Sequence, residues 1–261
     1  MQTLELATLT PKIQSVLVLG MEGAGKTHFI GTFPKPILLY SLDGGYQTLA
    51  GVSGVRAKVF TEVDRRKPVA AAEFEVEFAK YLAGQEPLYK WPDGKEEPFK
   101  TIAIDPLSFL SQYMMHNIQF VNRTTDKKPS WDEYDIVLKK WTDLLIRCLR
   151  VSAEQGAHVV CTCHVKIDKD EDTGQMWFLP DIAGSAREKL GAWFDAVFYL
   201  KVDKKPTGEK EYQLCTVGER RERARLRLPS AIEGTLKAIE VPDFAVISGR
   251  LEAAFKQQGG K

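Results

Sequence analysis

A glycine-rich stretch near the start of the chain contains the residue types that bind phosphate. Residues 20–27, here called the P-loop, read GMEGAGKT and fit the pattern G-x-x-x-x-G-K-[ST]. Glycine lets the backbone pass close to phosphate oxygens because it has no Cβ. Lys26 would reach the terminal phosphates of ATP, and the Thr27 hydroxyl would bind Mg²⁺. The residues predicted to bind ATP are Gly20, Glu22, Gly23, Ala24, Gly25, Lys26, Thr27 and His28.

The surroundings of the P-loop argue against a chance match, which about 1% of chains this long would contain. The apolar run Val16–Leu19 precedes it and predicts a strand, and a helical pattern follows it. The free N–H groups and the dipole at a helix N-terminus favour an anion. We therefore expect a triphosphate at the end of this strand.

A buried acid is the second expected part of the site. The sequence FKTIAIDPLSFL places Asp105 directly after an apolar strand. A carboxylate there would hold Mg²⁺ opposite Thr27. Asp105 could also cap the helix that begins near Pro106. The two roles are compatible, and we favour metal binding.

A general base is the third expected part. The strand Ile37–Leu42 follows the P-loop helix and ends at Asp43-Gly44-Gly45. We expect this strand to lie next to the P-loop strand, with its carboxyl end on the ligand side of the sheet. Asp43 would then orient or deprotonate the attacking water. The alternative is that Asp43 only forms an Asp-Gly turn.

A polar residue after a later strand is the fourth expected part. In AHVVCTCHVKID, His164 follows an apolar run and could sense the γ-phosphate. The alternative is a strand-end histidine bonded to the backbone. Cys161 and Cys163 lie beside it, but they share a strand face that His164 does not, and the chain has no second Cys/His pair for tetrahedral zinc. A zinc site is therefore not expected.

The elements that must position these residues alternate between strands and helices. This alternation predicts an α/β fold in which helices flank a mostly parallel, twisted sheet. The predicted strands are Ile13–Leu19, Ile37–Leu42, Thr101–Asp105, His158–Cys163, Ala196–Val202 and Glu211–Val217. The predicted helices are Val69–Leu82, Leu107–Phe120 and Trp131–Ala153. The last two strands are joined by a turn that contains Pro and Gly, which predicts an antiparallel C-terminal edge hairpin.

The composition is that of an ordinary globular protein. The chain has 261 residues, of which 44% are hydrophobic and 27% charged, and its net charge of +1 gives no global attraction to a polyanion. No signal peptide or membrane span is expected. Four cysteines without a disulfide framework favour a reducing, cytoplasmic location. We expect one domain, with an extension at 1–12, a core at 13–229 and a helical segment at 230–261.

The order of these features resembles the core of the RecA-type ATPases. The P-loop, the acid-ended strand after it, TIAID before a helix and CTCHVKID before a polar loop occur in the RecA order. GSAREKLGAWFDAVFYLKV resembles the RecA segment in which a helix leads into a strand after the second DNA-binding loop. More narrowly, the chain is similar to the phage RecA-like ATPases of the Sak-four group, which act in single-strand annealing and recombination. The resemblance covers roughly residues 13–229 and implies a RecA-like ATPase.

The resemblance implies roles for individual residues. Lys26 and Thr27 fall on the phosphate and Mg²⁺ residues, and Asp105 on the metal-side acid. Asp43 falls where RecA proteins have a catalytic glutamate, and His164 falls where RecA has a glutamine that couples nucleotide to DNA. The predicted catalytic residues are thus Lys26, Asp43, Asp105 and His164, and the predicted metal ligands are Thr27 and Asp105.

The resemblance also implies partners. Single-stranded DNA would face two loops, one after Phe120 that contains Arg123, Lys127 and Lys128, and one after Lys166 in which acids outnumber bases. A single-strand DNA-binding protein and further copies of the chain are candidate partners, and a phage-encoded chain would act in the host cytoplasm. About a dozen residues precede the first strand, fewer than the RecA arm that joins neighbouring subunits, so a filament would need a different joint.

A cluster of arginines lies late in the chain, in GERRERARLRLP. In a strand, alternate residues would form a row of guanidinium groups on one face. Such a row could bind the phosphates of DNA or of a neighbour's ATP. Alternatively, the row could be a solvated strand edge whose charges prevent sheet-to-sheet pairing. The cluster consists of Arg220, Arg221, Arg223, Arg225 and Arg227.

Two classes of function remain open. The favoured one is an ATPase that binds single-stranded DNA and promotes annealing or strand exchange. The other is a P-loop phosphotransferase or nucleotide-dependent switch without DNA binding, for which the arginine cluster would serve as a mobile lid.

Overall fold

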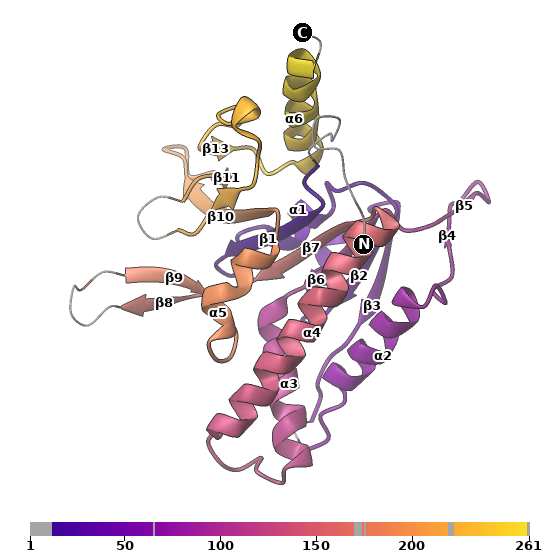
Figure 1. Ribbon diagram of the computed structural model, residues 1–261, viewed down its shortest axis with the longest axis vertical. Coiled ribbons are helices and arrows are strands. Elements are labelled where there is room, and N and C mark those ends of the chain that lie inside the picture. Colours follow the sequence, from indigo (N-terminus) through magenta and orange to yellow (C-terminus); the bar gives the residue numbers. More distant parts are fainter. Residues whose placement is uncertain (1–11, 65, 170–173, 175, 219–221, 260–261) are drawn as a thin grey trace.

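A mainly parallel sheet forms the centre of the computed structural model, which describes residues 12–64, 66–169, 174, 176–218 and 222–259. Within these residues nine strands form this sheet (Figure 1), in the order β13-β11-β10-β1-β7-β6-β2-β3, and β12 also pairs with β10. The bounds are β1 Ser15–Gly20, β2 Ile37–Ser41, β3 Val55–Val59, β6 Thr101–Asp105, β7 His158–Cys163, β10 Ala196–Lys204, β11 Lys210–Cys215, β12 Arg225–Leu226 and β13 Ile239–Glu240. Strands β10, β11 and β13 pair antiparallel, which makes an antiparallel edge.

Two short hairpins stand apart from this sheet. One pairs β4 (Tyr89–Lys90) with β5 (Glu96–Glu97), and the other pairs β8 (Val165–Lys169) with β9 (Met176–Pro180). In Figure 1 the β8–β9 hairpin extends away from the body on the side opposite β4 and β5.

The helices divide between the two faces of the sheet. Helices α2, α3 and α4 pack on the face that presents Leu17 and Leu19 of β1, and α1 and α6 pack on the face that presents Val16 and Val18. This alternation follows from the two-residue period of a strand that is buried on both sides. The helices are α1 Lys26–Ile30, α2 Ala70–Leu82, α3 Leu107–Val121, α4 Trp131–Gln155, α5 Ala186–Lys189 and α6 Phe244–Gly259, with 3₁₀ turns η2 Gly45–Leu49, η3 Leu190–Trp193 and η4 Ser230–Ile232.

Helix α4 has clear start and stop signals in its sequence. Ser130 caps its N-terminus in a capping box, in which Ser130 Oγ accepts from the Glu133 N–H and the Glu133 carboxylate accepts from the Ser130 N–H. The helix ends at Gly156, which has a left-handed φ of 65°. The buried Glu133 carboxylate also accepts from Thr124 Oγ1 and from Asn122 Nδ2 at 3.3 Å, which ties the α3–α4 loop to α4.

The outer strand β3 carries basic side chains that are tied to neighbouring segments. Lys58 Nζ donates to Glu77 at 2.7 Å and forms a short contact with Glu86. Arg56 donates to the carbonyls of Pro87 and Leu88 at 2.8 and 2.9 Å. The segment after α2 is therefore held against β3.

The structure confirms the predicted α/β class, the mostly parallel sheet and the antiparallel edge. It corrects the expected place of the strand before Asp43, because β7 and β6 lie between β1 and β2. Several elements were not predicted, among them the strands β3 and β13 and the β4–β5 and β8–β9 hairpins. The β8–β9 hairpin occupies the position of the expected second loop.

Candidate functional site

The P-loop connects the buried strand β1 to the short helix α1. A Cβ at Gly20 would lie 2.6 Å from the carbonyl oxygen of Leu200 on β10, so only glycine fits beside that strand. Gly23 and Gly25 have φ values of 74° and 87°, which L side chains rarely adopt. The space beside Gly23 is open, because a Cβ there would meet no atom within 4 Å. The loop thus has the backbone of a phosphate cradle.

Lys26 begins α1 and points back into the loop. Its ammonium donates to the carbonyl oxygens of Gly20 at 2.9 Å and Met21 at 2.8 Å, and its side chain is buried. Burial lowers the pKa of Lys26, and the nearby carboxylate of Asp105 opposes this effect. The loop therefore holds a desolvated cation at its centre.

Thr27 and Asp105 meet at the ends of two separate elements. Thr27 Oγ1 donates to Asp105 Oδ2 at 2.6 Å, and Thr162 Oγ1 of β7 makes a short hydrogen bond to Asp105 Oδ1. Burial raises the pKa of Asp105, while these two hydrogen bonds act in the opposite direction. The N-cap of α3 is Pro106, with no side-chain capping bond. Asp105 therefore faces Thr27 and does not cap α3.

Asp43 lies beside this pair, although its strand is not next to β1. Its Oδ1 accepts from the N–H of Gly45 at 2.8 Å, which is the turn contact considered as the alternative. A Cβ at Gly45 would lie 3.0 Å from Thr27 Oγ1 and 3.5 Å from Asp105 Oδ2. The Asp43 turn thus reaches the Thr27–Asp105 pair, and a role for Asp43 in orienting water stays a prediction.

His164 lies directly after β7 and contacts the start of α3. Its N–H donates to Ser108 Oγ at 2.8 Å, and its carbonyl oxygen accepts from the Asp181 N–H at 2.8 Å. Its ring packs edge-on against Phe109, and its ring nitrogens make no hydrogen bond to another described residue. Burial, and then the charge of Lys26, lower the pKa of His164. The backbone of His164 is therefore held in place, while its ring nitrogens remain available to bind a ligand.

The remaining predicted loop residues are on the surface or play a packing role. Glu22 and His28 are exposed, and Ala24 is buried.

The cysteines near His164 are buried and bind other side chains. Cys163 Sγ lies 3.3 Å from Ser108 Oγ, and the buried Cys161 contacts the thiol of Cys148. Within the part of the chain that the structure describes, no group of three or more His, Cys, Asp or Glu side chains could hold a metal.

Sequence reasoning missed two residues of the site. Thr162 was detectable as a hydroxyl in an otherwise apolar strand that ends at the site. Tyr212 of β11 had no such signal. A Cβ at Gly25 would lie 3.1 Å from Tyr212 Cδ1, so this ring packs on the P-loop from a strand far away in sequence.

Within the described residues, the arginine cluster does not lie in one continuous strand. Arg220 and Arg221 lie outside the described residues. Strand β12 spans only Arg225–Leu226, and Arg225 Nη2 donates to the carbonyls of Gly191 and Phe194. Arg227 donates to the carbonyl of Ala192. These two guanidinium groups therefore bind carbonyl oxygens of η3 and of Phe194 directly after it, and are not free to bind a phosphate.

Basic side chains are accessible at two other places on the surface. Arg223 is exposed at the edge of a cavity of about 390 Å³. The α3–α4 loop exposes Arg123, Lys127 and Lys128. These side chains are available to an anionic partner.

The chemistry of the site fits a magnesium nucleotide. The left-handed glycines shape an open loop, Lys26 supplies a cation, and hydroxyl and carboxylate oxygens of Thr27 and Asp105 are ligands that Mg²⁺ prefers. Lys26 and the loop would hold the phosphates, and Thr27 with Asp105 would hold the metal. When bound, Mg²⁺ would neutralise charge on the transferred phosphoryl group.

Comparisons with known proteins agree with this geometry. The sequence matches the family described as AAA domain over residues 12–228. A search of curated proteins found no match. Among the described helices, none combines the length and apolar character needed to cross a membrane. The match covers the P-loop, Asp105 and β10, and the chain therefore belongs to the AAA domain family of nucleotide-binding P-loop ATPases.

Proposed function

We propose that this chain is a RecA-like ATPase that binds single-stranded DNA and promotes strand annealing or exchange. One observation carries the proposal. The two segments expected to face DNA contribute to the same cavity of about 720 Å³, which lies between α3, α4 and the segment after β9. Pro129 and Trp131 come from the first segment, Lys166 comes from the second, and Asp181 follows the β8–β9 hairpin that contains the second.

The cavity adjoins the nucleotide site through α3. Ser108 lines the cavity and also accepts the His164 N–H, and α3 begins two residues after Asp105. The segment Asp105–Ser108 would therefore lie between a nucleotide at the P-loop and a ligand in the cavity. This proximity supports an ATPase whose rate depends on DNA.

Charge around the cavity supports the choice of DNA. Arg123, Lys127 and Lys128 are exposed in the α3–α4 loop, which is held by Glu133 and ends beside Trp131. Exposed cations bind phosphates mainly through release of counterions. The alternative of a phosphotransferase lid loses support, because Arg225 and Arg227 are bound to backbone carbonyls.

The test is ATP hydrolysis and oligonucleotide binding by the full chain. We expect hydrolysis to rise when single-stranded DNA is added, and affinity to fall with salt at a slope of about 0.7 per contacted phosphate. Replacing Lys127 and Lys128 by Ala should reduce the slope and weaken binding to all sequences alike. Lys90 and Lys100, exposed near the opposite end of β6, provide the matched double variant. No binding by the wild type, or equal slopes for the two double variants, would contradict the proposal.

A further inference from the structure

We propose that the 720 Å³ cavity receives one unstacked base of the bound DNA strand, which stacks on Trp131 and is held from the opposite wall by Arg187. This inference rests on the proposed function and adds to it a specific base site. It predicts that part of the affinity for DNA comes from a base and not from phosphates.

Trp131 is an exposed aromatic residue whose backbone position is fixed. It is the first residue of α4, immediately after the capping Ser130, and 88% of its surface is accessible. Apolar rings of this size are usually buried. The capping box fixes the backbone from which the indole projects, and the indole lines the cavity. An exposed indole at this place suits stacking on a base, because every base has a π-face.

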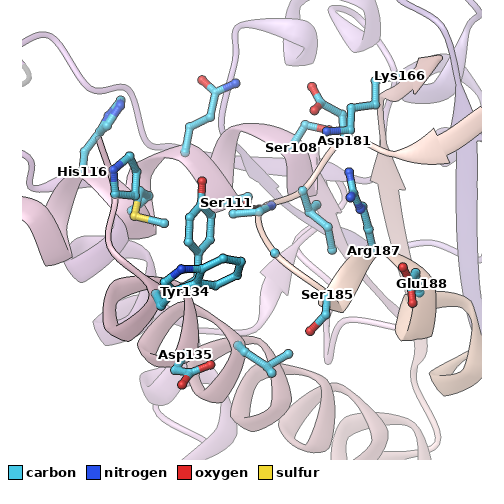
Figure 2. A pocket seen from close by; sticks show the side chains of 18 of the residues that line it. Ser108, Ser111, His116, Tyr134, Asp135, Lys166, Asp181, Ser185, Arg187 and Glu188 are labelled. Carbon is cyan, nitrogen blue, oxygen red and sulfur yellow. Dashed lines mark hydrogen bonds between the residues drawn. The ribbon is translucent and has the colours of Figure 1, made fainter. Parts of the chain in front are cut away.

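The opposite wall is formed by the segment after β9. The Ala183 N–H donates to Ser111 Oγ at 2.8 Å, and a Cβ at Gly184 would lie 3.6 Å from the Tyr134 ring. The segment is thus held to α3 and passes close to α4. Figure 2 shows Tyr134 on one side of the cavity and Lys166, Asp181 and Arg187 on the other.

Arg187 supplies an unused donor in this wall. Its Nε is buried and has no hydrogen-bond partner among the residues that the structure describes. No ion pair with a described acid compensates its charge either. The terminal nitrogens of Arg187 are the part of the guanidinium that a ligand in the cavity would reach, and a ligand that accepts hydrogen bonds from them would partly offset this uncompensated charge. A guanidinium plane can also stack on a base or donate to its edge.

The charges of the cavity favour a base over a phosphate. Asp135, Asp181 and Glu188 line it together with only two permanent cations, Lys166 and Arg187. Carboxylates repel phosphate, whereas they accept hydrogen bonds from the amino groups of bases. Phosphates would instead meet Lys127 and Lys128, just before Trp131 in the chain. The cavity volume lies in the usual range of about 300–1,000 Å³ for small-ligand sites.

The experiment compares two labelled oligonucleotides of equal length and charge in binding to the full chain. One carries normal bases, and the other carries abasic sites at every position. Wild type should bind the normal strand more tightly. Trp131→Ala should weaken binding to the normal strand on the order of tenfold and leave binding to the abasic strand unchanged. Trp131→Phe should keep most of the affinity, because a phenyl ring still stacks.

Two further variants sharpen the result. Arg187→Lys keeps the charge but loses the planar fork, so it should also weaken binding to the normal strand selectively. Trp91→Ala removes a tryptophan from the β4–β5 hairpin, away from the cavity, and should change neither affinity. Thermal melting of each variant checks that the fold is intact.

The outcomes separate this inference from the function on which it rests. Equal binding of wild type to normal and abasic strands, or an equal loss on both strands in Trp131→Ala, overturns the base site and leaves DNA binding in place. If wild type binds neither strand, the proposed function fails as well. A loss confined to the normal strand in both Trp131→Ala and Arg187→Lys supports the base site.

Discussion

Thr27 Oγ1 lies 2.6 Å from Asp105 Oδ2, so the first turn of α1 and the end of β6 are joined by a single hydrogen bond. Thr27 follows β1 and Asp105 ends β6, and these two strands are not neighbours, because β7 lies between them. Thr162 of that intervening strand binds the other carboxylate oxygen. The Asp105 carboxylate is thus buried, and each of its oxygens accepts a hydrogen bond from a threonine hydroxyl. A bound Mg²⁺ would replace the hydrogen bond from Thr27.

Asp105→Asn should separate metal binding from nucleotide binding. The amide keeps the shape of the side chain and removes the charge that Mg²⁺ needs. With a non-hydrolysable ATP analogue at 100 times its Kd, wild type should gain about 2.7 kcal/mol in unfolding free energy. EDTA should reduce this gain in wild type and leave it unchanged in the variant. Thermal melting with and without EDTA measures the stabilisation of both proteins by the analogue. If EDTA reduced this stabilisation equally in wild type and variant, the metal assignment would be disproved.

Lys26→Ala should abolish ATP hydrolysis, because no other cation of the P-loop can reach the γ-phosphate. The ligand-free variant should remain folded, since the change removes a buried charge from the loop. Phosphate release and circular dichroism measure the two properties. Turnover at the wild-type rate would refute the site.

Asp43→Asn should keep ATP binding and lose hydrolysis. Asparagine retains the Oδ1 acceptor for the Gly45 N–H, so the turn is preserved and only the charge is lost. The variant therefore distinguishes a base from a turn residue. Normal hydrolysis would leave Asp43 with the turn role alone.

Much of this site could be predicted because its signals are local. The P-loop spacing, the apolar strand before Asp105 and the Asp43-Gly44-Gly45 turn each lie within a few residues. The core strands were predicted to within a few residues because strands buried on both sides are continuous apolar runs. The nucleotide-binding character follows from the same stretch.

What could not be predicted depends on contacts between distant segments. Strand β3 is an outer strand with mixed polar and apolar residues, so its pattern is weak. The position of Tyr212 against Gly25 depends on how the C-terminal hairpin packs. Arg225 resembled a surface charge because the carbonyls it binds are about thirty residues away in sequence.

Arg225→Ala should lower the free energy of unfolding by about 1–3 kcal/mol, because the carbonyls of Gly191 and Phe194 lose a charged donor. Arg223→Ala is the matched control. Arg223 is exposed, and its removal should change stability by no more than about 0.5 kcal/mol. Urea unfolding of both variants provides the measurement, and equal midpoints would argue against a structural role for Arg225.

His158 should make stability fall in mild acid. Its Nδ1 lies 3.0 Å from the Ile13 carbonyl oxygen, and its ring packs against Phe33 and Phe244. Burial lowers the pKa of His158, and the charge of Lys12 adds to this while Glu252 opposes it. The folded state therefore binds fewer protons than the unfolded state. Stability is complete above the unfolded pKa of about 6.5 and is lost as pH falls through the folded value.

His158→Gln should reduce this acid sensitivity. Urea midpoints measured from about pH 7.5 down to about pH 5 should change less in the variant than in wild type. His28→Gln replaces an exposed histidine and should follow the wild-type curve. Parallel curves for wild type and His158→Gln would show that His158 has no such effect.

The tied basic side chains of β3 affect more than the fold of a single molecule. An outer strand presents unpaired backbone groups on which a strand of another molecule could form. On β3, Lys58 is held by Glu77 and Glu86, and Arg56 fixes the segment after α2 alongside. The charged side chains and the segment held alongside β3 oppose edge-to-edge pairing with another molecule. The contacts that stabilise β3 should therefore also protect the protein against aggregation at high concentration.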